Sequence, residues 1–321
     1  MRPALHIICL TALSLLAVAC REEVKPVPET KDRLTEAAME RLVAGPMEVV
    51  RTESLSAGEA TFKRLLADTK LRKGPSSLEA ADLLTSFGVE LDVENSKPGS
   101  PESEAARRYL RDAVPAYVSA LGPDHPEVAL ALNTSADMER QQSPDDPSPL
   151  VDSLLQQALQ IRMRTLGPNN PETVATLTQL ANVRSLPERL KRNPNELADA
   201  DALYRRAIAG ALPGPEGDER SNKAAIELRL AKLHARSGDP RIALAEAKKA
   251  LVTSEDWRPA YRRCQLVEAD LNNFVELMSA RGMRTQAQAL LPKVSESACN
   301  GSTRGESVLA SFLRRLGLGP S

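Results

Sequence analysis

The sequence predicts an all-α solenoid, in which antiparallel helix pairs stack side by side along the chain. The phrase Leu-Gly-Pro-x-x-Pro-Glu occurs at residues 121–127 and again at residues 166–172, an offset of 45 residues, which lies within the range of periods found in stacked repeats. Aromatic residues make up only 3% of the 321 residues, whereas the helix formers Ala, Leu, Glu and Arg are abundant. Before the second phrase, residues 154–161 carry Leu, Ala and Ile at helical spacing.

The repeated phrase contains the residues that end one helix and begin the next. Gly122 and Gly167 can adopt the left-handed conformation that ends a helix, and the Pro after each cannot continue one. The second Pro opens the next helix, where its missing N–H costs nothing. Glu127 and Glu172 then interact favourably with the helix dipole. Fainter copies of the phrase lie at residues 74–81 and 214–225.

The chain begins with a targeting segment. Arg2 precedes an apolar stretch at residues 4–19, which is shorter than the roughly 20 residues of a spanning helix but suits the core of a signal peptide. Residues 17–20, Ala-Val-Ala-Cys, resemble a bacterial lipobox, which implies a signal peptide over residues 1–19 and a lipid on Cys20. An ordinary cleaved signal and an uncleaved anchor are the alternatives.

The residues after the lipobox indicate in which membrane the protein is anchored and how the folded part is linked to the lipid. Arg21 follows Cys20; Asp at that position would imply retention in the inner membrane, so the resemblance favours the periplasmic face of the outer membrane. Residues 20–31 are charged, contain Pro and carry few apolar side chains. We therefore expect them to form a flexible, solvated tether.

Apolar periodicity places helices over the rest of the chain. Residues 32–74 hold two helices that form a degenerate hairpin, the first ending near Gly45 and the second centred on Phe62. Residues 75–301 hold the repeats, with long polar loops at 141–149 and 186–195. A last amphipathic helix within residues 302–321 is expected to cap the open end of the solenoid. The repeat helices are expected to pair as 77–95 with 102–120, 126–140 with 150–165, 171–185 with 196–211, 220–236 with 240–253, and 257–281 with 283–291.

The chain resembles the tetratricopeptide repeat family, in particular its longer, kinesin-light-chain-like variety. The resemblance is carried by residues 122–129, 132–136 and 157–162, and by the recurring segments 177–181 and 202–208. The pair at 220–253 fits the shorter form of roughly 34 residues. Ser135 departs from the family by replacing the expected Leu, and the usual Tyr late in the inner helix is missing. The resemblance implies a right-handed superhelical solenoid with a concave surface lined by the inner helices.

In this family an extended peptide of a partner protein lies along the concave groove. Counting from the Leu-Ala packing pairs of the inner helices predicts which exposed side chains face the groove, and all but one of them are polar. The alternative is a wet polar face with no specific ligand. The expected groove residues are Asn133, Asp137, Arg140, Thr178, Asn182, Ser185, Leu228, Lys232 and Arg236.

The sequence offers no set of residues for catalysis, a metal or a cofactor. Of its three histidines, His6 lies in the signal, His125 in a repeat turn, and His234 at the family's aromatic packing position, where a core role is expected. No Cys-x-x-Cys, His-Glu-x-x-His, Gly-x-Ser-x-Gly or phosphate-binding Gly loop occurs. The net charge of −1 gives no field that favours nucleic acid. We therefore expect a protein that is not an enzyme and needs no cofactor.

Two cysteines remain after the signal and the lipidation site, Cys264 and Cys299. An even number of cysteines in an oxidising compartment favours a disulfide. A helix from Cys264 to about residue 281 and a return path from residue 283 would bring the two side by side. The alternative is a buried, reduced Cys264 and an exposed Cys299.

These observations predict a lipid-anchored scaffold or adaptor for protein–protein interactions in the bacterial cell envelope, for example an assembly factor for an envelope complex. The expected partners are an extended peptide or protein in the groove and the membrane through the lipid, with no nucleic acid. A rival hypothesis is an accessory or regulatory subunit of an envelope enzyme whose catalytic part lies on a separate chain. A third is a structural spacer without a dedicated ligand.

Overall fold

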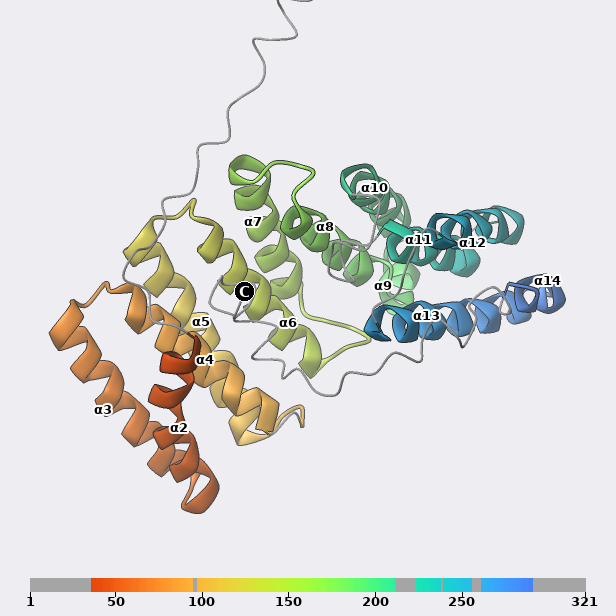
Figure 1. The fold of residues 1–321 in the computed structure, drawn as a ribbon. Coiled ribbons are helices and arrows are strands. Elements are labelled where there is room, and N and C mark those ends of the chain that lie inside the picture. The colour runs from red at the N-terminus through yellow and green to blue at the C-terminus, as the bar shows by residue number, and fades with distance from the viewer. Residues whose placement is uncertain (1–35, 95–96, 212–222, 238, 256–260, 291–321) are drawn as a thin grey trace, which may run out of the picture.

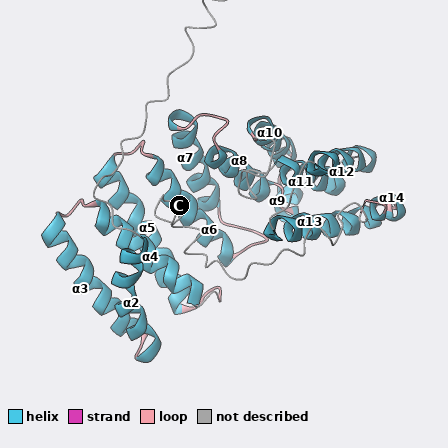
Figure 2. Cartoon of the chain, in the orientation of Figure 1, coloured by secondary structure: helices cyan, strands magenta, loops and turns pink. Residues whose placement is uncertain are grey.

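The computed structural model describes residues 36–94, 97–211, 223–237, 239–255 and 261–290. These ranges form helices joined by turns and loops, without any strand (Figure 2). The signal peptide, Cys20, the tether, Cys299 and the capping helix fall outside the described residues, as does the side chain of Cys264. The lipid anchor, the disulfide and the cap therefore stay predictions.

The described helices stack as antiparallel pairs along an arc, with α2 and α3 at one end and α13 and α14 at the other (Figure 1). Substantial contacts join the helices within each pair and join neighbouring pairs. This is the all-α solenoid that the repeated phrase predicts. The pairs are α2 (Glu36–Thr52) with α3 (Leu55–Lys73), α4 (Leu78–Glu94) with α5 (Pro101–Leu121), α6 (Pro126–Gln142) with α7 (Pro149–Thr165), α8 (Pro171–Arg184) with α10 (Asn195–Gly210), α11 (Lys223–Ser237) with α12 (Pro240–Glu255), and α13 (Tyr261–Ala280) with α14 (Arg284–Gln288).

The repeated phrase acts as predicted at both of its strong copies. Gly122 and Gly167 have φ angles of 89° and 82°, in the left-handed region that favours glycine. The residue before the second Pro caps the next helix: Nδ1 of His125 accepts a hydrogen bond from a backbone N–H at 3.2 Å, and Oδ1 of Asn170 does the same at 2.9 Å. The phrase therefore ends, turns and restarts a helix, as its residues dictate.

Two helical predictions are wrong in detail. The first helix was expected to end near Gly45, but α2 continues through Pro46 to Thr52. Val43 and Met47, on either side of the proline, are both buried, so tertiary packing holds the helix across a residue that lacks an N–H donor. The loop at 186–195 was expected to be irregular, but it contains a short helix, α9 (Pro187–Arg192).

The buried apolar residues form two clusters that meet at α11. The first runs from α2 to α11 and the second from α11 to residue 290. Helix α11 contributes Ile226 and Leu230 to the first cluster and Leu228 and Ala231 to the second. A continuous core therefore passes from pair to pair, as expected for a solenoid whose repeats cannot bury their apolar faces alone.

The first hairpin is an integral part of this core. Phe62 of α3 stacks on Phe87 of α4, with ring centroids 4.1 Å apart, and Tyr109 of α5 meets both rings edge-on. Such aromatic pairs add to the burial of their large apolar area. None of the described helices combines the length and the apolar character that crossing a membrane requires.

Candidate binding pocket on the inner helices

A pocket of about 190 Å³ opens where α6, α7, α8 and α11 meet. Its wall combines apolar side chains with carboxylate, amide and guanidinium groups. Such a mixed wall can hold an apolar side chain and also bind polar groups of a ligand. The lining residues are Ala136, Asp137, Arg140, Pro144, Val151, Leu155, Gln179, Asn182, Val183, Leu186 and Arg229.

The pocket contains three of the predicted groove residues, Asp137, Arg140 and Asn182. Arg140 is half-exposed, and one of its guanidinium nitrogens lies 3.7 Å from the Asp137 carboxylate. An exposed pair at this distance contributes little to stability, so both groups are available to a ligand at modest cost.

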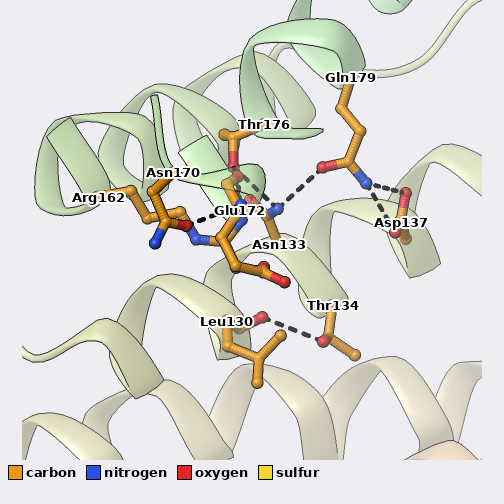
Figure 3. A network of polar contacts seen from close by, with 9 residues as sticks. All are labelled: Leu130, Asn133, Thr134, Asp137, Arg162, Asn170, Glu172, Thr176 and Gln179. Atoms are coloured by element: carbon orange, nitrogen blue, oxygen red, sulfur yellow. Dashed lines mark hydrogen bonds and ion pairs between the residues drawn. The ribbon is translucent and has the colours of Figure 1, made fainter. Parts of the chain in front are cut away.

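A polar ladder fixes one wall of the pocket (Figure 3). The side-chain N–H₂ of Asn133 donates to Oε1 of Gln179 at 2.8 Å and to the hydroxyl of Thr176 at 3.2 Å. The amide of Gln179 in turn donates to the carboxylate of Asp137 at 3.1 Å. The ladder thus runs from inside the α6–α8 contact to the pocket, and it holds Gln179 and Asp137 in fixed orientations.

The ladder is anchored at its inner end by Arg162 of α7, which is almost fully buried. Its guanidinium donates to the Thr176 hydroxyl at 2.5 Å and to the backbone carbonyl of Glu172 at 3.1 Å, and it pairs with the Glu172 carboxylate at 2.7 Å. A buried charge is tolerated only when it is paired and hydrogen-bonded in this way.

The expectation that all the groove residues are exposed is wrong for four of them. Asn133 is only 5% exposed and belongs to the ladder, and Thr178, Ser185 and Leu228 are buried as well. The reason is that an inner helix has neighbours on three sides: ten of the fourteen residues of α8 are buried. Polar character alone therefore does not mark the open face of such a helix.

Three lining positions on or next to α8 and α11 differ by one residue from the predicted ones, whereas Asn182 lines the pocket as predicted. Gln179 lines the pocket instead of Thr178, Leu186 instead of Ser185, and Arg229 instead of Leu228. An error of one residue moves a side chain by about 100° around the helix axis. Packing against neighbouring helices, which the local sequence does not show, decides which of these positions stay open.

Two predicted residues of α11 have other roles. The guanidinium of Arg236 donates to the backbone carbonyl of Ser185 at 3.1 Å, which satisfies a carbonyl at the end of α8. Arg281 repeats this contact one helix later by donating to the carbonyl of Ala235 at 3.0 Å. Lys232 is half-buried and does not line the pocket. These arginines bind successive inner helices together.

Tyr204 of α10 fixes the side chain of Asn182 in the pocket. Its hydroxyl donates to Oδ1 of Asn182 at 2.7 Å and lies 3.3 Å from the Ser185 hydroxyl. An earlier pair uses the same device, because the Tyr117 hydroxyl donates to the Asp82 carboxylate at 2.7 Å. An outer-helix tyrosine thus orients a polar side chain on the inner helix of the same pair.

The unpredicted helix α9 shapes the edge of the pocket, because Leu186 immediately precedes it. Arg189 of α9 binds Asp152 of α7 at 2.5 Å and Glu196 of α10 at 2.8 Å. Burial alone would lower the pKa of Arg189, but these two carboxylates raise it above its usual value. Arg184 lies within 3.8 Å of the same carboxylates. The network explains why this loop is helical and held against the solenoid.

His234 joins three helices, which refines its expected role in packing. Its ring nitrogens lie 2.5 Å from the Glu246 carboxylate of α12 and 2.8 Å from the Asp201 carboxylate of α10. The bond to Glu246 raises the pKa of His234 above its usual value, against the opposing effect of burial. Arg205 binds Asp201 at 2.7 Å.

No group of His, Cys, Asp and Glu in the described ranges could hold a metal ion.

Comparisons with known proteins agree with this architecture. The tetratricopeptide repeat family model matches residues 102–127, which include most of α5 and the following turn. Among solved structures, BtubC (BKLC) from P. vanneervenii is similar over 84% of this chain and 95% of its own, with 16% identity and a TM-score of 0.52. A Podosopora anserina protein described as of kinesin light chain type, with nearly identical TPR-like repeats, covers 66% of this chain and 91% of its own, with 17% identity and a TM-score of 0.47. No curated protein matches the sequence.

The paired helices, the positive-φ glycine turns and the match to the repeat model point to the same architecture. The likeness to the BtubC structure extends over most of both chains. The chain therefore has the fold of an all-α solenoid built of tetratricopeptide-like repeats.

Proposed function

We propose that this solenoid is a scaffold that binds an extended peptide of a partner protein in the pocket at the junction of α6, α7, α8 and α11. The repeat fold is one that serves protein–protein interactions. The observation that carries the proposal is the wall of the pocket, where Asp137, Arg140 and Asn182 are oriented beside the apolar Leu155 and Val183. A peptide backbone offers both N–H and C=O groups, which this mixture of acceptors and donors can bind.

The pocket is fixed before a ligand arrives. Gln179 holds Asp137, Tyr204 holds Asn182, and the Arg189 network holds the segment that carries Leu186. Side chains that are already ordered lose little entropy on binding. The fixed orientation of these pocket side chains favours a dedicated peptide ligand. In a structural spacer, side chains held in this way would have no ligand to bind.

The proposal is tested by screening a displayed library of random peptides for binding to the chain without residues 1–20. Arg140→Ala should weaken the best peptide by at least about tenfold, because a hydrogen bond to a charged group contributes on the order of 1.5–3 kcal/mol. Arg164→Ala is the matched control, since Arg164 is also an exposed arginine that binds an aspartate, Asp124, away from the pocket. Equal binding by both variants, or failure to select any peptide, would contradict the proposal.

We further propose that a lipid on Cys20 holds the scaffold at the bacterial cell envelope, on the periplasmic side of the outer membrane. The lipobox-like residues 17–20 and the tether that follows support this. Stable anchoring needs more than one acyl chain, so the Cys20→Ser variant should move from the membrane to the soluble fraction. Retention of the variant in carbonate-washed membranes would rule out this anchor.

A further inference from the structure

The outward face of α3 is basic, and no other helix of the described residues packs against it. Helix α3 packs against α2 and α4 through buried residues such as Phe62 and Thr69. On the opposite side it exposes Lys63, Arg64 and Lys70, which we call the α3 basic face. At 3.6 residues per turn, these three side chains lie within an arc of about 120°. The helix therefore presents a narrow cationic stripe, and α3 lies at one end of the arc of described helices (Figure 1).

Leu71 lies in the same arc and is 86% exposed, which makes it the most exposed large hydrophobic side chain of the described residues. Ser56, Ala60 and Ala67, which are all small, occupy the other positions of the stripe. Cations around an apolar side chain can contact a lipid headgroup layer, because the cations are attracted to anionic headgroups and the apolar side chain gains by leaving water.

The three cations are not engaged by other side chains of the described residues. No side-chain hydrogen bond or ion pair joins the α3 basic face to any other part of the described chain. Arg72, just outside the stripe, by contrast binds Asp68 at 2.6 Å. The charge of the α3 basic face is thus directed at solvent and available to an anionic partner.

We propose that the α3 basic face, with Leu71, rests on a membrane leaflet that contains anionic phospholipids. This inference extends the proposed lipid anchoring at Cys20. Residues 21–35 separate Cys20 from α2, and fully extended they span at most about 50 Å. Helix α3 pairs with α2, so an anchored chain keeps the α3 basic face within reach of the bilayer. An acidic protein could also bind this face, but the anchor would not hold such a protein near it, and we therefore favour the membrane as the partner.

The two contacts would act together. A single anchor leaves the solenoid free to rotate about its tether, whereas an anchor plus an electrostatic face fixes the end that touches the membrane. With α3 on the bilayer, the arc of helices extends away from it, and the pocket at α6 to α11 lies along the solenoid from the contact (Figure 1).

The proposal is tested by sedimentation with vesicles of phosphatidylcholine, with or without phosphatidylglycerol. The chain without residues 1–20 is suitable, because both core clusters consist of residues 39–290. It should bind only the vesicles that contain phosphatidylglycerol. Binding should fall between about 0.1 M and about 1 M salt, where the screening length drops from about 10 Å to about 3 Å.

The decisive variant carries Lys63→Gln, Arg64→Gln and Lys70→Gln. Its partition onto phosphatidylglycerol vesicles should fall at least about tenfold, because each basic side chain near an anionic surface contributes roughly fivefold. The control removes the same charge at the exposed residues Lys191, Arg241 and Lys248 on α9 and α12, and should bind as the unaltered chain does.

If the two variants lose vesicle binding equally, the binding depends on net charge and not on the α3 basic face, and the proposal is overturned. Binding to soluble polyglutamate, but not to vesicles, with the same dependence on the α3 residues would also overturn it, since this would assign the face to an acidic protein. Circular dichroism of each variant checks that the helices are intact. The vesicle assay uses a chain without Cys20, so its result does not depend on the lipid anchor. Vesicle binding can therefore fail while fractionation of the Cys20→Ser variant still supports the anchor, and vesicle binding can succeed while the anchor is ruled out.

Discussion

At the scale of single residues, several polar side chains of the inner helices connect neighbouring helices instead of facing an open surface. Asn133 appears from its sequence position to be a groove residue, yet it joins α6 to α8 through Thr176 and Gln179. Its two donor hydrogens are both used, which a groove residue awaiting a ligand would not require. A structural role of such a residue can therefore be distinguished from a ligand-binding role only when the burial of its side chain is known.

Asn133→Ala should destabilise the fold by about 1–3 kcal/mol, because it leaves the buried oxygen of Gln179 without its donor. Urea unfolding measures the change. The exposed Asn195 at the start of α10 provides the matched control, and Asn195→Ala should stay within about 0.5 kcal/mol. If the two variants lose equal stability, the ladder does not stabilise the α6–α8 contact.

His234 should make stability depend on pH. Its pKa is raised, first by the bond to Glu246 and also by Asp201, while Arg205 lies within 3.7 Å of Glu246 and binds Asp201. A raised pKa means that the stabilisation is complete below the unfolded value of about 6.5 and is lost as pH rises through the folded value. The advantage in unfolding free energy over His234→Gln should therefore be larger at about pH 6 than at about pH 8. A difference that stays constant or grows with pH would show that the imidazolium is not the stabilising form.

At the scale of elements, the sequence predicts helices and turns well because their signals are local. The Gly-Pro phrase fixes the turns at Gly122 and Gly167, where φ is positive in both cases. The failures at α2 and α9 have causes that are distant in sequence. Packing of Val43 and Met47 carries α2 past Pro46, and ion pairs of Arg189 to two other helices order α9. The face of α8 was misassigned for the same reason, since its neighbours decide which side stays open.

Two glycines in helices should respond to the same substitution to different degrees. A Cβ at Gly210 would lie 2.5 Å from the carbonyl oxygen of Pro168 and 3.1 Å from a methyl group of Val174, so the end of α10 needs glycine to pack on the repeat turn. Gly210→Ala should cost about 1–3 kcal/mol. A Cβ at Gly45 would meet nothing within 4 Å apart from its chain neighbours, but Pro46 follows it, and the proline ring disfavours a helical residue with a Cβ at that position. The gain in helix propensity and this clash oppose each other, so Gly45→Ala should change stability by less than about 1 kcal/mol. Thermal unfolding of both variants decides; stabilisation by Gly210→Ala would contradict the close approach.

At the scale of the whole molecule, stability should be distributed along the chain, because substantial contacts join only neighbouring pairs of the described helices. In such a solenoid the total is close to a sum of repeat and nearest-neighbour terms. The two apolar clusters share only α11. A perturbation at one end should therefore fade before it reaches the other.

Phe274 of α13 and Phe87 of α4 test this, since both are fully buried but in different clusters. Replacing either by Ala should cost about 3–5 kcal/mol locally. In hydrogen exchange, Phe274→Ala should lower the protection of α11 to α14 and leave α4 and α5 as they were, while Phe87→Ala should do the reverse. The helices around the pocket lie between the two sites and report how far each perturbation travels. A uniform loss of protection along the chain in both variants would instead mean that the solenoid unfolds as one unit, and that α11 transmits the whole of the coupling between its two clusters.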